Sequence, residues 1–159
     1  MSGTWRWRTG LPLDVRQTLD PTGSFQQIGR PDQVGEFVRL DPNKVRTFTL
    51  ADGRSVTGRF AFDPTAFARV TPKSFDELRA GTVSRNTFTT KGFQQWDLRL
   101  GRPVATGETT SFYIGLDFIN LFGNKNWAAP FNNIDDPFFG IVRTEGLGRV
   151  FQATMRFIF

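Results

Sequence analysis

The stretch Phe151-Gln152-Ala153-Thr154-Met155-Arg156-Phe157-Ile158-Phe159 sets the expectation for the fold. Successive side chains of a β-strand point to opposite faces, so every second residue shares a face. One face then holds only apolar residues, and the other is mostly polar. The apolar series runs to the last residue, where a water-soluble domain usually frays into polar residues. The pattern predicts a C-terminal strand over residues 148–159 with one face against an apolar medium.

Two upstream segments alternate in the same way. Residues 92–104 and residues 110–122 are each predicted to form a strand. We interpret their apolar series as lipid-facing: Trp96, Leu98, Leu100, Phe112, Ile114, Leu116 and Phe118. The opposite series carries charges: Asp97, Arg99, Asp117 and, in the last strand, Arg156. In a soluble sandwich this face meets solvent, whereas in a wide barrel it lines the lumen, and pairing across strands is the default role of such charges.

The two connections between these strands differ in length. Residues 105–109 (Ala-Thr-Gly-Glu-Thr) form a short polar turn, whereas residues 123–147 form a longer segment rich in Asn, Pro and Gly. Bacterial barrels have short periplasmic turns and long extracellular loops. The sequence therefore predicts that the turn is periplasmic and that the loop is extracellular.

The N-terminal part is predicted to hold a strand end, residues 1–9, and a long extracellular loop, residues 10–91. Trp5 and Trp7 alternate with two arginines, and we assign both rings to an aromatic girdle at a membrane interface. Trp127, beside a proline in the other loop, is assigned to loop packing. A loop of this length is either functional or partly disordered.

Two elements are predicted inside the long loop. Asp52-Gly53 between residues 47–50 and 55–57 is typical of a small hairpin. Ser74 and Glu77 have the spacing of a helix capping box, and Gly81 follows as a helix end, which predicts two helical turns.

Composition excludes several classes of function. The chain has no Cys and no His, which removes thiolate and imidazole metal sites, Cys nucleophiles and His bases. Its only adjacent carboxylate pairs, Asp76-Glu77 and Asp135-Asp136, lack the companions that calcium binding or hydrolysis requires, and turn and helix-start chemistry explains them better. We expect no catalytic residue, no cofactor and no metal, and hence no enzyme.

Hydropathy and charge narrow the class further. No apolar run approaches the roughly 20 residues of a membrane-spanning helix, whereas a barrel strand needs only about 9 to 11 residues. The formal charge of +5 and the pI near 10.4 would suit a nucleic-acid partner, but the basic residues are scattered singly. We therefore expect no nucleic-acid partner.

Four motifs resemble the end of TonB-dependent receptors of the Oar-like type, which carry a carboxypeptidase-regulatory-like N-terminal domain. They are Arg85-Asn86-Thr87-Phe88, Gly92-Phe93-Gln94-Gln95-Trp96-Asp97-Leu98, Phe118-Ile119-Asn120-Leu121-Phe122-Gly123 and Arg156-Phe157-Ile158-Phe159. Upstream, Thr9-Gly10-Leu11-Pro12, Gly29-Arg30-Pro31-Asp32 and Phe62-Asp63-Pro64-Thr65-Ala66-Phe67 look like the last large extracellular loop of that family. Each motif is weak singly, and their order and spacing make the match.

The resemblance implies an all-β fold: about four C-terminal strands of a plugged outer-membrane barrel of about 22 strands. It implies energy-coupled uptake of an unidentified nutrient, with outer-membrane lipid as surroundings and the TonB complex as a partner through an N-terminal part that is absent here. Four strands cannot close a barrel, so we expect the chain to be a fragment of a longer protein.

The C-terminal alternation also resembles the signal read by the barrel-assembly machinery. The residues assigned to this signal are Phe151, Ala153, Met155, Phe157 and Phe159. An edge strand can be captured by strand addition, so a polar residue at position 159 is expected to lower the assembled amount of the parent protein.

Two rival interpretations remain open at this point. One is a soluble antiparallel β-domain that binds carbohydrate or protein through its aromatic residues. The other, more distant, is a basic nucleic-acid module that uses Trp5-Arg6-Trp7-Arg8 for stacking and phosphate contact.

Overall fold

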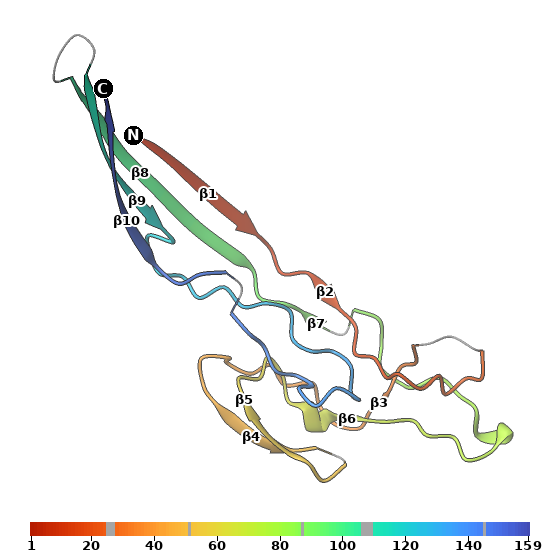
Figure 1. Cartoon of the computed structure of the whole chain (residues 1–159). Coiled ribbons are helices and arrows are strands. Elements are labelled where there is room, and N and C mark those ends of the chain that lie inside the picture. Colours follow the sequence, from red (N-terminus) through yellow and green to blue (C-terminus); the bar gives the residue numbers. More distant parts are fainter. Residues whose placement is uncertain (25–27, 51, 87, 106–109, 145) are drawn as a thin grey trace. The chain divides into compact units, whose positions relative to one another are not determined.

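The computed structural model describes residues 1–24, 28–50, 52–86, 88–105, 110–144 and 146–159 (Figure 1). The chain divides into two compact units. The sheet unit comprises Met1–Thr9, Gly92–Trp127 and Thr144–Phe159. The loop unit comprises Gly10–Lys91 and Ala128–Arg143. Both units are therefore assembled from segments that lie far apart in the sequence.

The sheet unit is a four-stranded antiparallel sheet in the order β1-β8-β9-β10 (Figure 1). Its strands are β1 (Ser2–Arg8), β8 (Phe93–Ala105), β9 (Ser111–Ile119) and β10 (Val150–Ile158). The chain is all-β and antiparallel here, as the alternation predicts. The turn predicted at residues 105–109 falls largely on residues 106–109, which lie outside the described residues.

The register brings the alternating apolar residues into rows that cross the sheet. Leu98 of β8 pairs with Phe118 of β9, which pairs with Phe151 of β10. Trp5 of β1 pairs with Trp96 of β8. Because directly paired residues share a face, one face of the sheet is apolar across all four strands.

β9 ends at Ile119, three residues before the predicted end at residue 122. Asn120 takes a left-handed conformation with φ of 53°, and Gly123 follows with φ of 65°. Asn is one of the few residues besides Gly that adopts this conformation routinely. The chain therefore turns away from the sheet within the Phe118–Gly123 motif.

The loop unit contains three short antiparallel pairs. β2 (Pro12–Leu13) pairs with β7 (Phe88–Thr89), and β3 (Asp32–Gln33) pairs with β6 (Phe67–Ala68). The third pair is a hairpin of β4 (Arg46–Thr49) and β5 (Ser55–Gly58). Gly53 lies between its strands with φ of 82°, so the structure has the hairpin that Asp52-Gly53 predicts.

The prediction of two helical turns after Ser74 is wrong. The structure has a single 3₁₀ turn, η2 (Phe75–Glu77), and Ser74 makes no side-chain cap. Glu77 instead accepts a hydrogen bond from the Lys73 backbone N–H at 2.7 Å. A short helix gains too few hydrogen bonds to offset its nucleation cost, and Leu78 is already extended. The other 3₁₀ turn is η1 (Pro64–Ala66), and no described helix has the length and apolar character needed to cross a membrane.

Phenylalanine rings form the core of the loop unit. Phe62 and Phe67 meet edge to face with centroids 5.6 Å apart, and Phe62 meets Phe139 at 5.4 Å. Phe139 belongs to residues 128–143. Gly140, which follows it, accepts a backbone hydrogen bond of 3.0 Å from Ala61, which precedes Phe62. The two loop segments therefore fold around one shared core.

Candidate functional site: the two faces of the sheet

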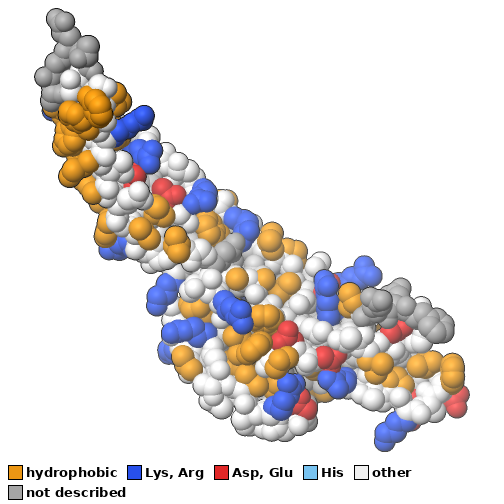
Figure 2. All heavy atoms as spheres, viewed as in Figure 1, with side chains coloured by type: hydrophobic (Ala, Val, Ile, Leu, Met, Phe, Trp, Pro, Cys, Tyr) orange, Lys and Arg blue, Asp and Glu red, His pale blue; other side chains and the backbone are white. Residues whose placement is uncertain are grey.

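The apolar face of the sheet is exposed. Phe151 is 61% exposed, Met155 73% and Phe159 96%, whereas large apolar side chains of a soluble sheet are normally covered. Figure 2 shows hydrophobic side chains gathered along one flank of the sheet unit. Of the residues predicted to face lipid, Trp96, Leu100, Ile114 and Leu116 are also exposed, and Leu98, Phe112 and Phe118 are partly covered. Most of this face is therefore left uncovered by the residues that the structure describes.

Aromatic pairs occupy both ends of this face. Trp5 and Trp96 stack with ring centroids 5.2 Å apart, and Phe122 meets Trp96 edge to face at 5.9 Å. At the other end, Phe112 and Phe157 lie 6.4 Å apart. Trp7, two residues after Trp5 on β1, is 62% exposed. Between these rings lie the exposed aliphatic side chains of Leu100, Ile114 and Leu116.

One charged residue on the apolar face was missed by the sequence analysis. Arg102 has the same parity as Leu98 and Leu100 and pairs with Ile114. The alternation was followed only to Gly101, and its extension by one residue would have placed Arg102 among the apolar side chains. The apolar face is therefore not uniformly uncharged.

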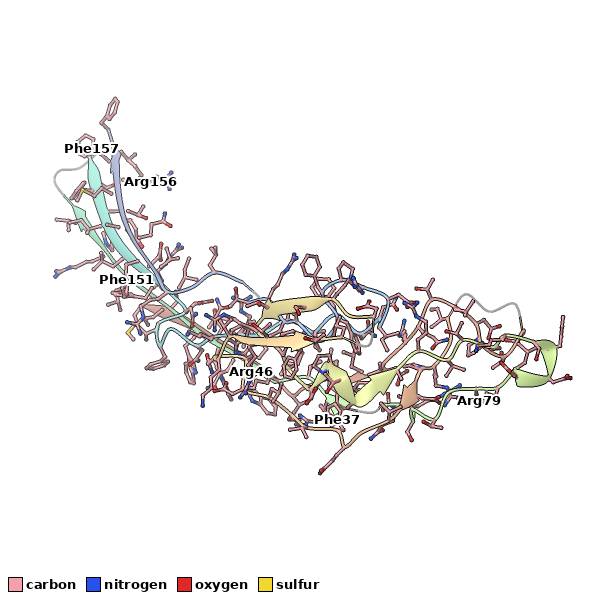
Figure 3. All side chains as sticks on the ribbon, turned by 90° about the horizontal axis from the view of Figure 1, so that it is seen from below. Phe37, Arg46, Arg79, Phe151, Arg156 and Phe157 are labelled. Atoms are coloured by element: carbon pink, nitrogen blue, oxygen red, sulfur yellow. The ribbon has the colours of Figure 1, made fainter. Side chains whose placement is uncertain are left out.

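The opposite face carries ion pairs between neighbouring strands. Arg99 of β8 and Asp117 of β9 are directly paired and bind through two contacts, one of them 2.9 Å from Nη2 to Oδ2. Arg6 of β1 lies 3.1 Å from Asp97 of β8. Figure 3 shows Arg156 pointing away from the side occupied by Phe151 and Phe157. The charges predicted on one parity are thus gathered on one face, and cross-strand pairing occupies most of them.

This polar face is hollowed. A shallow cavity of about 490 Å³ lies over the ion pairs and reaches Thr4, Gln152 and Thr154. Backbone and side chains of β1, β8, β9 and β10 all contribute to its lining. The polar face of the sheet is therefore concave at the position of the ion pairs.

Two glycines on the polar face make room for a ring. A Cβ on Gly101 would lie 2.0 Å from the Tyr113 hydroxyl, and one on Gly115 would lie 2.9 Å from the Tyr113 ring. Gly101 and Gly115 are directly paired, so the tyrosine covers a gap that spans two strands. Glycine weakens a strand interior, and a covering aromatic ring compensates for the missing side chains.

Comparison with known proteins agrees with this geometry. Residues 1–152 match a family described as "Outer membrane beta barrel domain". The chain belongs to this family. Its location is therefore the outer membrane. No curated protein and no solved structure matches the chain.

At the end of β8 where the long connections begin, asparagine side chains bond to backbone groups in place of a neighbouring strand. Asn126 accepts from the Gln94 N–H at 2.9 Å and donates to the Gln94 carbonyl at 3.0 Å, as a neighbouring strand residue would. Asn120 and Asn124 exchange two further bonds of 2.9 and 3.0 Å. The sequence analysis missed this role, although three asparagines within seven residues, at positions 120, 124 and 126, are its signal.

The carboxylate pairs serve local structure in the loop unit. Asp135 accepts from the Thr18 N–H at 2.7 Å, and Asp136 accepts from the Phe138 N–H at 2.8 Å. Within the described ranges, no three His, Cys, Asp or Glu side chains gather as metal ligands.

Trp127 is buried, at 7% exposure, and pairs with Thr144.

The loop unit offers a separate apolar hollow of about 290 Å³. Phe67, Phe139 and Ile134 line it, and Asp52 and Arg69 stand at its rim. Arg69 is paired with Asp135, and Arg54 with Asp52, so the rim charges are already compensated. Hydrogen bonding from Arg54 lowers the pKa of Asp52 below its usual value. The hollow is therefore lined mainly by apolar side chains, and its described charged residues, Asp52 and Arg69, already have ion-pair partners.

Proposed function

We propose that this chain supplies four neighbouring strands to the wall of a TonB-dependent receptor, and that it has no enzymatic role. The observation that carries the proposal is the two-sided sheet, with an exposed apolar face and an ion-paired polar face on the same strands. A soluble β-domain would have covered the apolar face with its own chain. The nucleic-acid alternative gains no support, because Arg6 and Arg99 are paired with carboxylates.

The sheet edges support a larger barrel. β1 and β10 are the outer strands of the sheet, so each has one side without a strand neighbour among the described residues. Lipid cannot satisfy the backbone N–H and C=O groups of such an edge, and the smallest single-chain barrels have about eight strands. Further strands therefore pair with β1 and β10 in the functional barrel.

The lengths of the connections support an orientation. Residues 106–110 join β8 to β9, whereas residues 9–92 and 120–149 join the strands at the opposite end of the sheet. Short turns are periplasmic and long loops are extracellular in bacterial barrels. In this orientation the loop unit lies outside the cell and contributes to nutrient capture, and the polar face lines the lumen.

The TonB-dependent class rests on the motifs that resemble Oar-like receptors, including the Asn120 turn and the aromatic C-terminus. In that class, the TonB complex acts through an N-terminal part, and the barrel-assembly machinery reads the last strand. A plug and further strands encoded in frame upstream of Met1 would support the class. An upstream reading frame without a plug would contradict it and leave the barrel proposal standing.

Labelling of neighbouring residues in one strand tests the two faces. The native chain has no cysteine, so single-cysteine variants carry no background. Gln152→Cys lies on the polar face and Ala153→Cys on the apolar face, at nearly the same depth, and both positions are exposed in the isolated sheet. In outer membranes, a water-soluble maleimide should label position 152, and position 153 only after unfolding in urea. Equal labelling of both positions in the folded protein would contradict the lipid-facing assignment.

A further inference from the structure

A single cation interrupts the apolar face of the sheet. Arg102 lies between Leu100 and Val104 on β8 and opposite Ile114 on β9, and the next residue in its row is Met155 of β10. Its side chain is exposed and forms no hydrogen bond or ion pair with any residue that the structure describes. All other described residues on this face of the strands are uncharged. Packing within the sheet therefore gives no reason for an arginine at this position.

We propose that Arg102 extends toward the Phe112–Phe157 end of the sheet and binds the phosphate of a phospholipid headgroup there. The inference rests on the proposed lipid-facing role of this surface. Hydrocarbon offers no acceptor for the five N–H donors of a guanidinium, and a charge on the lipid face is costly near the bilayer centre but tolerated near the interface. Phosphate oxygens match the guanidinium fork and carry the opposite charge.

Arg102 lies past the middle of the apolar band, about 10 Å of depth short of the interface at the far end of the sheet. Six residues separate it from Trp96, which corresponds to about 20 Å along the strand and about 15 Å of membrane depth at the usual barrel tilt. With Trp96 at one interface of an apolar band about 25 Å tall, Arg102 lies in the far half. One row further on, Phe112 and Phe157 pair at the end of the sheet. A long arginine side chain can extend along the strand toward this end and bring its charge closer to the headgroups.

Arg156 provides a matched control. It pairs with Tyr113, which pairs with Pro103, so Arg156 lies within one residue of the Arg102 row but on the polar face. Figure 3 shows Arg156 on the side opposite Phe151 and Phe157. Both arginines are exposed, and each substitution by glutamine removes one positive charge at the same depth. A difference in vesicle binding between the two variants therefore depends on which face carries the arginine, because both variants lose the same net charge.

Vesicle partition of the full chain tests the proposal. The chain is diluted from urea into vesicles of digalactosyldiacylglycerol, an uncharged lipid without phosphate, with or without a minor share of phosphatidylglycerol, and the bound fraction is measured by flotation. Phosphatidylglycerol should strengthen binding of the unsubstituted chain and of Arg156→Gln. In Arg102→Gln this gain should fall about fivefold, the usual contribution of one cation near an anionic surface, and Arg102→Lys should keep most of it.

Each other outcome would overturn the proposal. Equal losses in Arg102→Gln and Arg156→Gln would show attraction by net charge alone, and a full gain in Arg102→Gln would show that Arg102 does not contact the headgroup. Loss of the gain when inorganic phosphate is added to the buffer would identify free phosphate, and not lipid, as the ligand. A chain that binds none of the vesicles would overturn this inference, whereas the cysteine labelling in outer membranes tests the lipid-facing role separately.

Discussion

The sheet unit and the loop unit use phenylalanine in opposite ways. In the loop unit, Phe62 and Phe139 are 0% and 1% exposed and meet other rings. In the sheet unit, Phe151 and Phe157 are 61% and 58% exposed. The same side chain is thus hidden by protein in one region and left uncovered in the other.

The difference is what the proposed function expects, because the two units would then meet different surroundings. Moving a whole phenylalanine side chain out of water stabilises the folded state by about 1.5 to 3 kcal/mol, and the loop unit buries its rings in its own core. A ring on a barrel wall is covered by lipid and needs no protein partner. The phenylalanines of the loop-unit core and those of the sheet face therefore differ in what covers them, and each set can be tested separately.

The largest expected effect comes from emptying the centre of the loop-unit core. Phe62→Ala removes a fully buried ring that touches Phe67 and Phe139 and should cost about 3 to 5 kcal/mol of local stability. Hydrogen exchange of the chain refolded in detergent micelles measures it, through backbone amides at 60–68 and 131–142. Protection should fall in both segments together, because they share the core.

Phe151→Ala is the matched control on the sheet. Its ring meets Phe118 edge to face at 5.3 Å but is otherwise exposed, so loop-unit protection should not change. Loss of loop-unit protection in Phe151→Ala, or its retention in Phe62→Ala, would contradict the division of phenylalanines into two kinds of burial.

A second, smaller effect is expected where the sheet unit does depend on close packing. Gly101→Val places side-chain atoms in the space of the Tyr113 ring and should destabilise the sheet by about 1 to 3 kcal/mol. The double variant Gly101→Val with Tyr113→Ala should recover most of the loss, because the ring is removed. Urea titration of the chain in micelles, followed by the fluorescence of Trp5 and Trp96, measures both. A double variant no more stable than Gly101→Val would show that the ring does not set the need for glycine.

Sequence alone predicted the parts of the fold that local rules determine. Alternation with a period of two identifies β8, β9 and β10, and the pair Asp52-Gly53 identifies the β4–β5 hairpin. The loop-unit core was not predicted, because Phe62 and Phe139 come from separate connections and no local pattern joins them. Their contact depends on long-range packing, which a single sequence does not display.

The structure places the alternating residues on two opposite faces of the sheet, and two exceptions were missed for physical reasons. Arg102 was missed because the apolar series was followed only to the first glycine, although the strand continues to Ala105. Asn120 was placed inside a strand because alternation does not reveal a left-handed backbone. Local sequence patterns fail most often at functional or strained positions, and the left-handed Asn120 is one of them.

Low pH should lower the stability of the folded loop unit, because it protonates Asp32. Arg79 donates two hydrogen bonds to this carboxylate, at 2.8 and 2.6 Å, and they are the main cause that lowers its pKa from the usual 3.8. Because the folded pKa is the lower one, the stabilisation is complete above about pH 4 and is lost as the pH falls through the folded pKa. The effect should be smaller than that of Gly101→Val. Exchange protection of the loop unit measured down to pH 3 should fall less steeply in Asp32→Asn, and an unchanged slope would count against the pair.

The smallest effect is expected from the ion pair on the polar face of the sheet. Arg99 and Asp117 are 64% and 14% exposed, so water screens their attraction despite the two contacts between them. A double-mutant cycle of Arg99→Gln and Asp117→Asn, measured by urea titration in micelles, should give a coupling of about 0.2 to 1 kcal/mol that shrinks with added salt. A coupling of several kcal/mol would mean that the pair is dry, as it would be against lipid. That result would reverse the assignment of the two faces, because a lumen wall is wet and a lipid-facing wall is not.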